Sequence, residues 1–146
     1  MFKITKQQAK NVFKKTTLPK YLLNEGINIV MPEKDAKAWL KALRSGEYDQ
    51  IGGSLTDGAG GFCCLGVQQH CKLKGYVEID ERGYVREFPT KQYLQENGIF
   101  YANKFGRKGH NPYLQSLNEL ASEANDWGDC NFDEIADALE KSIAVY

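Results

Sequence analysis

The chain has 146 residues, of which 42% are hydrophobic, and this size and composition predict one domain with a single packed core. Its 19 basic residues balance 19 acidic residues, which argues against steered binding to bulk nucleic acid. No stretch approaches the roughly 20 apolar residues that span a bilayer, and the first ten residues lack the apolar core of a secretory signal, so we expect the protein to remain in the cytoplasm where it is made.

The N-terminal part of the chain predicts a helix followed by a strand. Residues 1–25 are rich in lysine, and three apolar residues have helical spacing before Pro19 interrupts the pattern: Ala9, Val12 and Phe13. We interpret this segment as a short N-terminal helix or docking arm. After Gly26, the apolar run 27–31 predicts a brief strand.

The clearest helix in the sequence follows Pro32, a residue that the first turn of a helix tolerates. Apolar residues then recur at i, i+3, i+4 and i+7, which places them on one face: Ala36, Trp39, Leu40 and Leu43. Gly46 suits the left-handed conformation that ends a helix. We therefore expect Trp39 to be a core residue rather than a platform for a ligand.

Two hairpins are predicted in the middle of the chain. In residues 51–66 the turn-forming sequence DGAGG separates two apolar runs, and in residues 76–88 the sequence ERG separates two alternating runs. A helix is expected to begin near Leu65 and to end at Gly75. These patterns predict at least four strands.

Helices are predicted for most of the remaining chain. A short helix after Pro89 ends at Gly98, and the segment 99–110 is irregular. A helix then carries Leu114, Leu117, Ala121 and Ala124 on one face, and a final helix, capped by Asn131 and Glu134, carries Phe132, Ile135, Ala136, Leu139 and Ile143. The predicted fold is a single α+β domain over residues 1–146, with a small, mostly antiparallel sheet of hairpins covered by helices and a C-terminal helix pair.

The four cysteines raise the question of a metal site. Zinc would need four ligand atoms, and these residues could supply them: Cys63, Cys64, His70, Cys71 and Cys130. Adjacent residues of a strand point to opposite faces, however, and the chain has no Cys-X-X-Cys pair. Since the spacing is also unlike a disulfide framework, we expect reduced thiols, no metal and no cofactor.

A catalytic thiol is a second interpretation of the cysteines. Cys64 lies where a strand meets a predicted helix, whose N-terminus would favour a thiolate. The two histidines of the chain, His70 and His110, are then the candidate bases. The third interpretation, which we favour, is that Cys63 and Cys64 are small buried hydrophobic residues.

Three further motifs are weaker. Most glycines near the cysteines precede the predicted strand, unlike those of nucleotide fingerprints, so turns explain them; Gly66 is the exception, because bare amides at a helix start can bind an anion. Residues 129–140 half-match a calcium loop, but Glu134 occupies the position that requires glycine. The last two predicted helices resemble a helix-turn-helix, although the final one is acidic and would repel phosphates.

The segment after Phe100 has the most ligand-like composition of the chain. It combines cations with aromatic residues: Tyr101, Lys104, Phe105, Arg107, Lys108 and His110. Cationic side chains pair with phosphates and aromatic faces stack on bases, so this loop would suit a nucleotide or a short single strand. Arg44 would add an anion contact if the fold brought it close. The alternative is a solvated surface loop.

Several blocks of sequence occur together in one known set of proteins. The strings WLKALRSGEYDQ, FCCLGV, NPYLQSLNEL and FDEIADALE resemble the ALRSGxYxQ, CCLGV, Asn-Pro and FxEIADxIE blocks of small proteins encoded by tailed bacteriophages. The resemblance spans roughly residues 35–143. It implies a phage accessory protein and carries no activity with it. The chain departs from the pattern at residues 68–71, where relatives often place a cysteine and an aspartate, and in a longer segment before Asn131.

These observations lead to a first functional hypothesis and its rivals. We expect a non-enzymatic phage protein in the host cytoplasm that binds and blocks a host factor, either a nucleotide-like signal of antiviral defence or a host protein, and that forms a homo-oligomer. The main rival is a cysteine-dependent hydrolase or transferase that uses Cys64 and a histidine. A purely structural role in the virion is a third hypothesis. No membrane partner and no bulk nucleic acid are expected.

Overall fold

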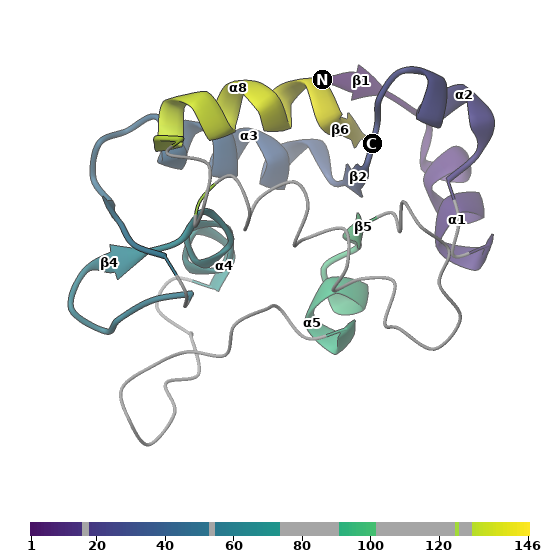
Figure 1. Cartoon of the computed structure of the whole chain (residues 1–146). Helices are drawn as coiled ribbons and strands as arrows, with labels where there is room; N and C mark the ends of the chain where they lie inside the picture. The colour runs from purple at the N-terminus through teal and green to yellow at the C-terminus, as the bar shows by residue number, and fades with distance from the viewer. Residues whose placement is uncertain (16–17, 53–54, 74–90, 102–124, 126–129) are drawn as a thin grey trace.

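The computed structural model describes residues 1–15, 18–52, 55–73, 91–101, 125 and 130–146 (Figure 1). Its elements, in chain order, are β1 (Phe2–Lys3), α1 (Lys6–Lys15), α2 (Lys20–Asn24), β2 (Ile29–Met31), α3 (Glu33–Leu43), β3 (Asp49–Gln50), β4 (Gly61–Phe62), α4 (Cys64–Leu73), α5 (Lys91–Glu96), β5 (Phe100–Tyr101), α8 (Phe132–Ser142) and β6 (Ile143–Val145). The predicted hairpin at 76–88 and the predicted helix that carries Leu114 lie outside the described residues. Within those residues, no helix has the length and apolarity needed to cross a membrane.

The main sheet has four strands in the order β1-β6-β2-β5, so the last strand of the chain lies between the first two. Strand β6 runs parallel to both neighbours, with Phe2 opposite Ala144 and Val30 opposite the same residue on the other side. Strand β5 pairs with β2 in the antiparallel direction. The two ends of the chain therefore meet in one sheet, as Figure 1 shows.

The predicted sheet of antiparallel hairpins is wrong. In the main sheet two of the three strand pairs are parallel, and the small second sheet pairs β3 with β4 in parallel as well. The physical reason lies in the burial of the strands. All residues of β2 and β6 are buried, so these strands read as short apolar runs rather than as alternating patterns, which is typical of strands covered on both faces.

The turn predicted within residues 51–66 is present, but the strands beside it are not those of a hairpin. The Asp57 Oδ1 atom accepts hydrogen bonds from the amides of Ala59 (2.8 Å) and Gly61 (2.9 Å), which folds the chain back. Among the residues of this segment that the structure describes, the antiparallel pairing is a single bridge between Thr56 and Phe62. Strand β4 instead runs parallel to β3, which lies before the expected hairpin.

The predicted helices within the described residues are present. The helix after Pro32 is α3, and Gly46 follows it with φ +74°, as expected of a left-handed stop. The final helix, α8, begins with the predicted capping box, in which Asn131 Oδ1 accepts from the Glu134 amide and Glu134 Oε2 accepts from the Asn131 amide. Ile143 is not part of its apolar stripe, however, because it begins β6.

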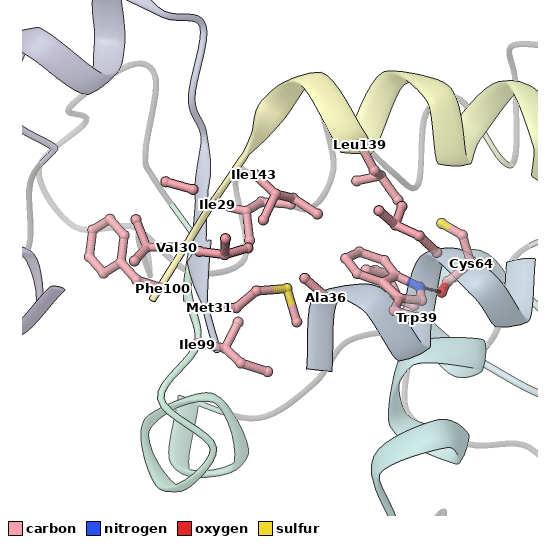
Figure 2. Packing of buried hydrophobic residues seen from close by; sticks show 14 of the residues in the cluster. Ile29, Val30, Met31, Ala36, Trp39, Cys64, Ile99, Phe100, Leu139 and Ile143 are labelled. Carbon is pink, nitrogen blue, oxygen red and sulfur yellow. Dashed lines mark hydrogen bonds between the residues drawn. The ribbon is translucent and has the colours of Figure 1, made fainter. Parts of the chain in front are cut away.

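The core lies between the main sheet and the helices α3, α4 and α8 (Figure 2). Helix α3 contacts both α4 and α8, and its apolar face buries Trp39 completely. The indole Nε1 of Trp39 donates to the backbone oxygen of Cys64 at 2.8 Å, so the ring fills the core and its polar atom is paired. The prediction that Trp39 is a core residue is confirmed.

Candidate functional site

One pocket lies between α1, the end of α5 and the last residue of the chain. Its volume is about 410 Å³, within the range of small-molecule sites. These residues line it: Lys6, Ala9, Lys10, Phe13, Gln95, Gly98 and Tyr146. We call this feature the α1 pocket. It draws on three segments that are far apart in the sequence, which the main sheet brings together.

The charge at the α1 pocket is positive. Lys6 and Lys10 lie four residues apart on α1, so both fall on the side of the helix that faces the pocket, and both are exposed. Residues 1–24 contain six lysines, and the first acidic residue of the chain is Glu25. A positive rim of this kind attracts phosphate or carboxylate groups.

The wall of the α1 pocket is aromatic. The ring of Phe13 meets the rings of Phe100 and Tyr146 edge to face, with centroid distances of 6.1 and 6.2 Å. The Tyr146 hydroxyl donates to the backbone oxygen of Gly98 at 2.7 Å, and burial, with a smaller contribution from Asp35, raises the pKa of this phenol. A Cβ atom on Gly98, which has φ +64°, would collide with this hydroxyl, so glycine is required there.

The sequence indicates one part of this pocket, the helix that carries its lysines. The lysine-rich first segment and the helical spacing of Ala9 and Phe13 indicated an amphipathic helix. The sequence reasoning missed Lys6, Lys10, Phe13 and Tyr146 as pocket residues, because their proximity depends on the pairing of β6 between β1 and β2. No local pattern encodes that pairing.

The double cysteine lies at the start of α4, in a region that we call the α4 junction: Trp39, Cys63, Cys64, Gly66 and Asn125. The Cys63 thiol accepts a hydrogen bond from the Gly66 amide at 3.4 Å, in the manner of a helix cap. The Cys64 amide donates to Asn125 Oδ1 at 3.2 Å. Both cysteines are buried, and Cys64 is fully so.

Gly66 and Asn125 explain why the α4 junction is closed. A Cβ atom on Gly66 would collide with the backbone oxygen of Leu55, so the glycine allows α4 to approach that segment. The Asn125 side chain bridges α4 and β3, since its Oδ1 atom also accepts from Gln50 Nε2 (3.2 Å) and its Nδ2 atom donates to the Ile51 oxygen (2.6 Å). The amide of Gly66, proposed as an anion contact, is buried and faces the Cys63 thiol.

His70 belongs to a different cluster from Cys64. The Tyr48 hydroxyl lies 2.9 Å from His70 Nδ1 and 3.8 Å from the Cys71 thiol, while the Tyr48 and His70 rings both contact Phe62. Burial first, and the Cys71 hydrogen bond second, raise the pKa of Tyr48 to about 12. Burial also raises the pKa of the Cys71 thiol, against the effect of the Tyr48 hydroxyl. The Tyr48 phenol and the Cys71 thiol are therefore both neutral at pH 7.

The structure does not bring the candidate nucleophile and its candidate base together. Six residues of α4, or about 9 Å of helix rise, separate Cys64 from His70. No interaction between the two side chains occurs in the described part of the chain. The other candidate base, His110, lies outside the described residues. Among those residues, no three His, Cys, Asp or Glu side chains gather as a metal site would require.

Arg44 lies on the surface between α3 and α8. Its guanidinium contacts Asp137 Oδ1 at 2.7 Å and Glu140 Oε2 at 3.2 Å, and these hydrogen bonds raise its pKa above the usual value. Tyr101 lies in β5 opposite Ile29. The remaining residues of the predicted binding loop, Lys104, Phe105, Arg107 and Lys108, lie outside the described residues.

Comparison with known proteins places the chain in a family. A model of the family described as Domain of unknown function (DUF8296) matches residues 31–143. No curated protein and no solved structure is significantly similar to the chain. Of the residues that line the α1 pocket, Gln95 and Gly98 lie within the matched region, whereas those of α1 and Tyr146 lie outside it.

Proposed function

Given that the chain belongs to the DUF8296 family, we propose that it is a non-enzymatic phage accessory protein that binds and blocks a host factor, by holding a nucleotide-like signal of antiviral defence in the α1 pocket. The phage origin rests on the resemblance of the ALRSGEYDQ, CCLGV and FDEIADALE blocks. The binding site rests on the geometry of the α1 pocket. The host cytoplasm is the compartment in which such a ligand would be met.

The observation that carries the proposal is the pairing of two lysines with an aromatic wall in one pocket. Lys6 and Lys10 supply donors for an anion, while Phe13 and Tyr146 offer ring surface to a planar group. A nucleotide has both parts, a phosphate and a base. A simple inorganic anion would use only the lysines, and an uncharged ring would use only the wall.

The state of the α4 junction supports a non-enzymatic role. Cys64 is fully buried, and its backbone oxygen and amide are hydrogen-bonded to Trp39 and Asn125. His70 contacts the Tyr48 hydroxyl rather than the Cys64 thiol. A nucleophile must reach its substrate and its base. These contacts favour a packing role for Cys64 and give no support to the rival hydrolase or transferase.

A homo-oligomer is part of the proposal. The exposed Lys6 and Lys10 line the α1 pocket, so it reaches the protein surface, and small proteins often complete such sites with a second subunit. An added subunit would cover the ligand from the solvent side. Native mass spectrometry of the freshly purified protein would report both the subunit number and any bound ligand.

The test is direct binding by isothermal titration calorimetry, with AMP as the nucleotide and adenosine and inorganic phosphate as its separate parts. We expect AMP to bind more tightly than either part. The double substitution Lys6→Gln and Lys10→Gln should weaken AMP binding by at least tenfold, because two charge-assisted hydrogen bonds are worth more than about 1.5 kcal/mol each.

The matched control is the double substitution Lys34→Gln and Lys41→Gln on α3, which removes the same charge from exposed positions outside the pocket. This variant should bind AMP like the unaltered protein. Equal losses in both double variants would assign the effect to net charge rather than to the pocket. Absence of any bound ligand, together with no binding of AMP, would contradict the proposal and favour a host protein as the target.

A further inference from the structure

The lysines of α1 continue beyond the pocket. Lys6, Lys10 and Lys14 recur every four residues, and all three are exposed, whereas Ala9 and Val12 of the same helix are buried. We call these three residues the lysine row. Only Lys6 and Lys10 line the α1 pocket, so the row has one member that the pocket does not use.

The helix geometry gives the direction of the lysine row. Each step of four residues advances about 6 Å along the axis and turns by about 40°. From Lys6 to Lys14 the row therefore spans about 12 Å and winds gradually from the pocket to the open surface. A ligand that followed the row would have charged groups spaced along a chain rather than one compact charge.

No acidic residue of the described part of the chain forms an ion pair with the lysine row. Within the described residues, ion pairs join Lys3 and Lys37 to Glu33, and none involves Lys6, Lys10 or Lys14. Helix α1 contains no acidic residue, so no partner is available one turn away on the same helix. Arg44, by contrast, pairs with Asp137 and Glu140.

We infer that the ligand of the α1 pocket is a short oligonucleotide with two or three phosphates, whose base lies against Phe13 and Tyr146 and whose phosphates follow Lys6, Lys10 and Lys14. This inference rests on the proposed function and specifies its ligand. A mononucleotide would leave Lys14 without a role. A long nucleic acid is disfavoured, because the row has only three lysines and the exposed face of α8 carries Asp133, Glu134, Asp137 and Glu140.

The test compares AMP with the linear ligands pApA and pApApA in calorimetric titrations at several salt concentrations. We expect affinity to rise with each added phosphate, by about tenfold per step. The slope of the logarithm of affinity against the logarithm of salt concentration should steepen by about 0.7 for each further phosphate that the protein neutralises.

Substitution of Lys14 separates this inference from the proposed function. Lys14→Gln should leave AMP binding unchanged, remove most of the gain from pApA to pApApA, and reduce the salt slope by about 0.7. Lys14→Arg keeps the charge and should restore the gain. Lys41→Gln, on an exposed face of α3, is the matched control and should have no effect.

Three results would decide against the inference in different ways. If AMP, pApA and pApApA bound equally and Lys14→Gln had no effect, the inference that the ligand is an oligonucleotide would be wrong. The proposed nucleotide-binding function would stand. If Lys14→Gln weakened AMP binding as much as pApApA binding, the lysine row would attract anions non-specifically instead of contacting successive phosphates. The inference would then also be wrong. If none of the three bound, both the inference and the proposed function would be wrong.

Discussion

Helices α1 and α4 lie on different sides of the structure (Figure 1), and the α1 pocket and the α4 junction use their polar groups in opposite ways. At the α4 junction the Cys64 amide, the Cys64 oxygen and the Asn125 side chain are bonded to one another or to neighbouring segments. At the α1 pocket, Lys6 and Lys10 are exposed on the rim of an aromatic wall. The first region is built to pack and the second is open to a ligand.

A residue of a reactive type, such as cysteine, does not by itself indicate a functional site. The double cysteine draws attention in the sequence, yet its surroundings are occupied by protein contacts. The lysines of α1 look like ordinary surface residues, yet they lie where a cavity, ring surface and unbalanced charge coincide. The groups that remain available to a ligand are more informative than the groups with the strongest chemistry.

Gly66→Ala tests the packing of the α4 junction and should have the largest effect. The added Cβ would collide with the backbone oxygen of Leu55, which cannot move aside as a side chain would. We expect the free energy of unfolding to fall by about 4 kcal/mol or more, measured by urea denaturation. A variant as stable as the unaltered protein would show that α4 does not approach Leu55 so closely.

Gly46→Ala is the matched control for this substitution. Gly46 has φ +74°, and nothing lies within 4 Å of its added Cβ, so only the backbone conformation opposes the change. The expected loss is about 1–2 kcal/mol. The difference between the two glycine variants therefore measures the steric contribution at the α4 junction.

Cys64→Ala tests whether the α4 junction has any role besides packing. We expect it to lower the free energy of unfolding by about 1–2 kcal/mol, through the loss of a buried sulfur, and to leave AMP binding in the α1 pocket unchanged. Denaturation and calorimetry on the same sample measure both. A folded Cys64→Ala variant that lost a turnover found in the unaltered protein would reverse the comparison and support the hydrolase or transferase.

Tyr48→Phe should have the smallest effect, and one that depends on pH. The pKa of Tyr48 is about 12 in the folded protein and near 10 in the unfolded chain, so the contribution of this phenol to stability is complete below pH 10 and is lost as the pH rises from 10 toward 12. At pH 8 we expect Tyr48→Phe to melt a few degrees lower, because the hydrogen bond to His70 is lost.

The melting temperatures of the two proteins should converge as the pH rises from 10 toward 12. Other tyrosines ionise in both proteins and cancel in the difference. A constant difference over this range would mean that the Tyr48 hydroxyl is not held in its neutral form by the fold.

The sequence predicted the helices better than the sheet because helices are encoded locally. The spacing of Ala36, Trp39, Leu40 and Leu43, and the capping box of Asn131 and Glu134, each lie within a few turns of one element. Strand β6 was missed because Ile143 continues the apolar spacing of α8, and the strand itself is only three residues long. Its partners, β1 and β2, are far away in the chain.

For the candidate site, the sequence predicted the combination of residue types but not the positions of the residues. The expectation of cations beside aromatic rings was directed at residues 101–110, of which the structure describes only Tyr101. The same combination occurs where Lys6 and Lys10 meet Phe13 and Tyr146, which no spacing rule could bring together. Arg44 was a reasonable candidate from its charge, but its proximity to Asp137 and Glu140 follows from the packing of α3 against α8.

The position of β6 has a consequence for how the chain is made. Because β6 separates β1 from β2, β1 has no partner in the sheet, and β2 can pair only with β5, until the residues of β6 have been synthesised. Pairing over so long a sequence separation is slow. The wall that Tyr146 contributes to the α1 pocket is therefore expected to form only after β6 has paired.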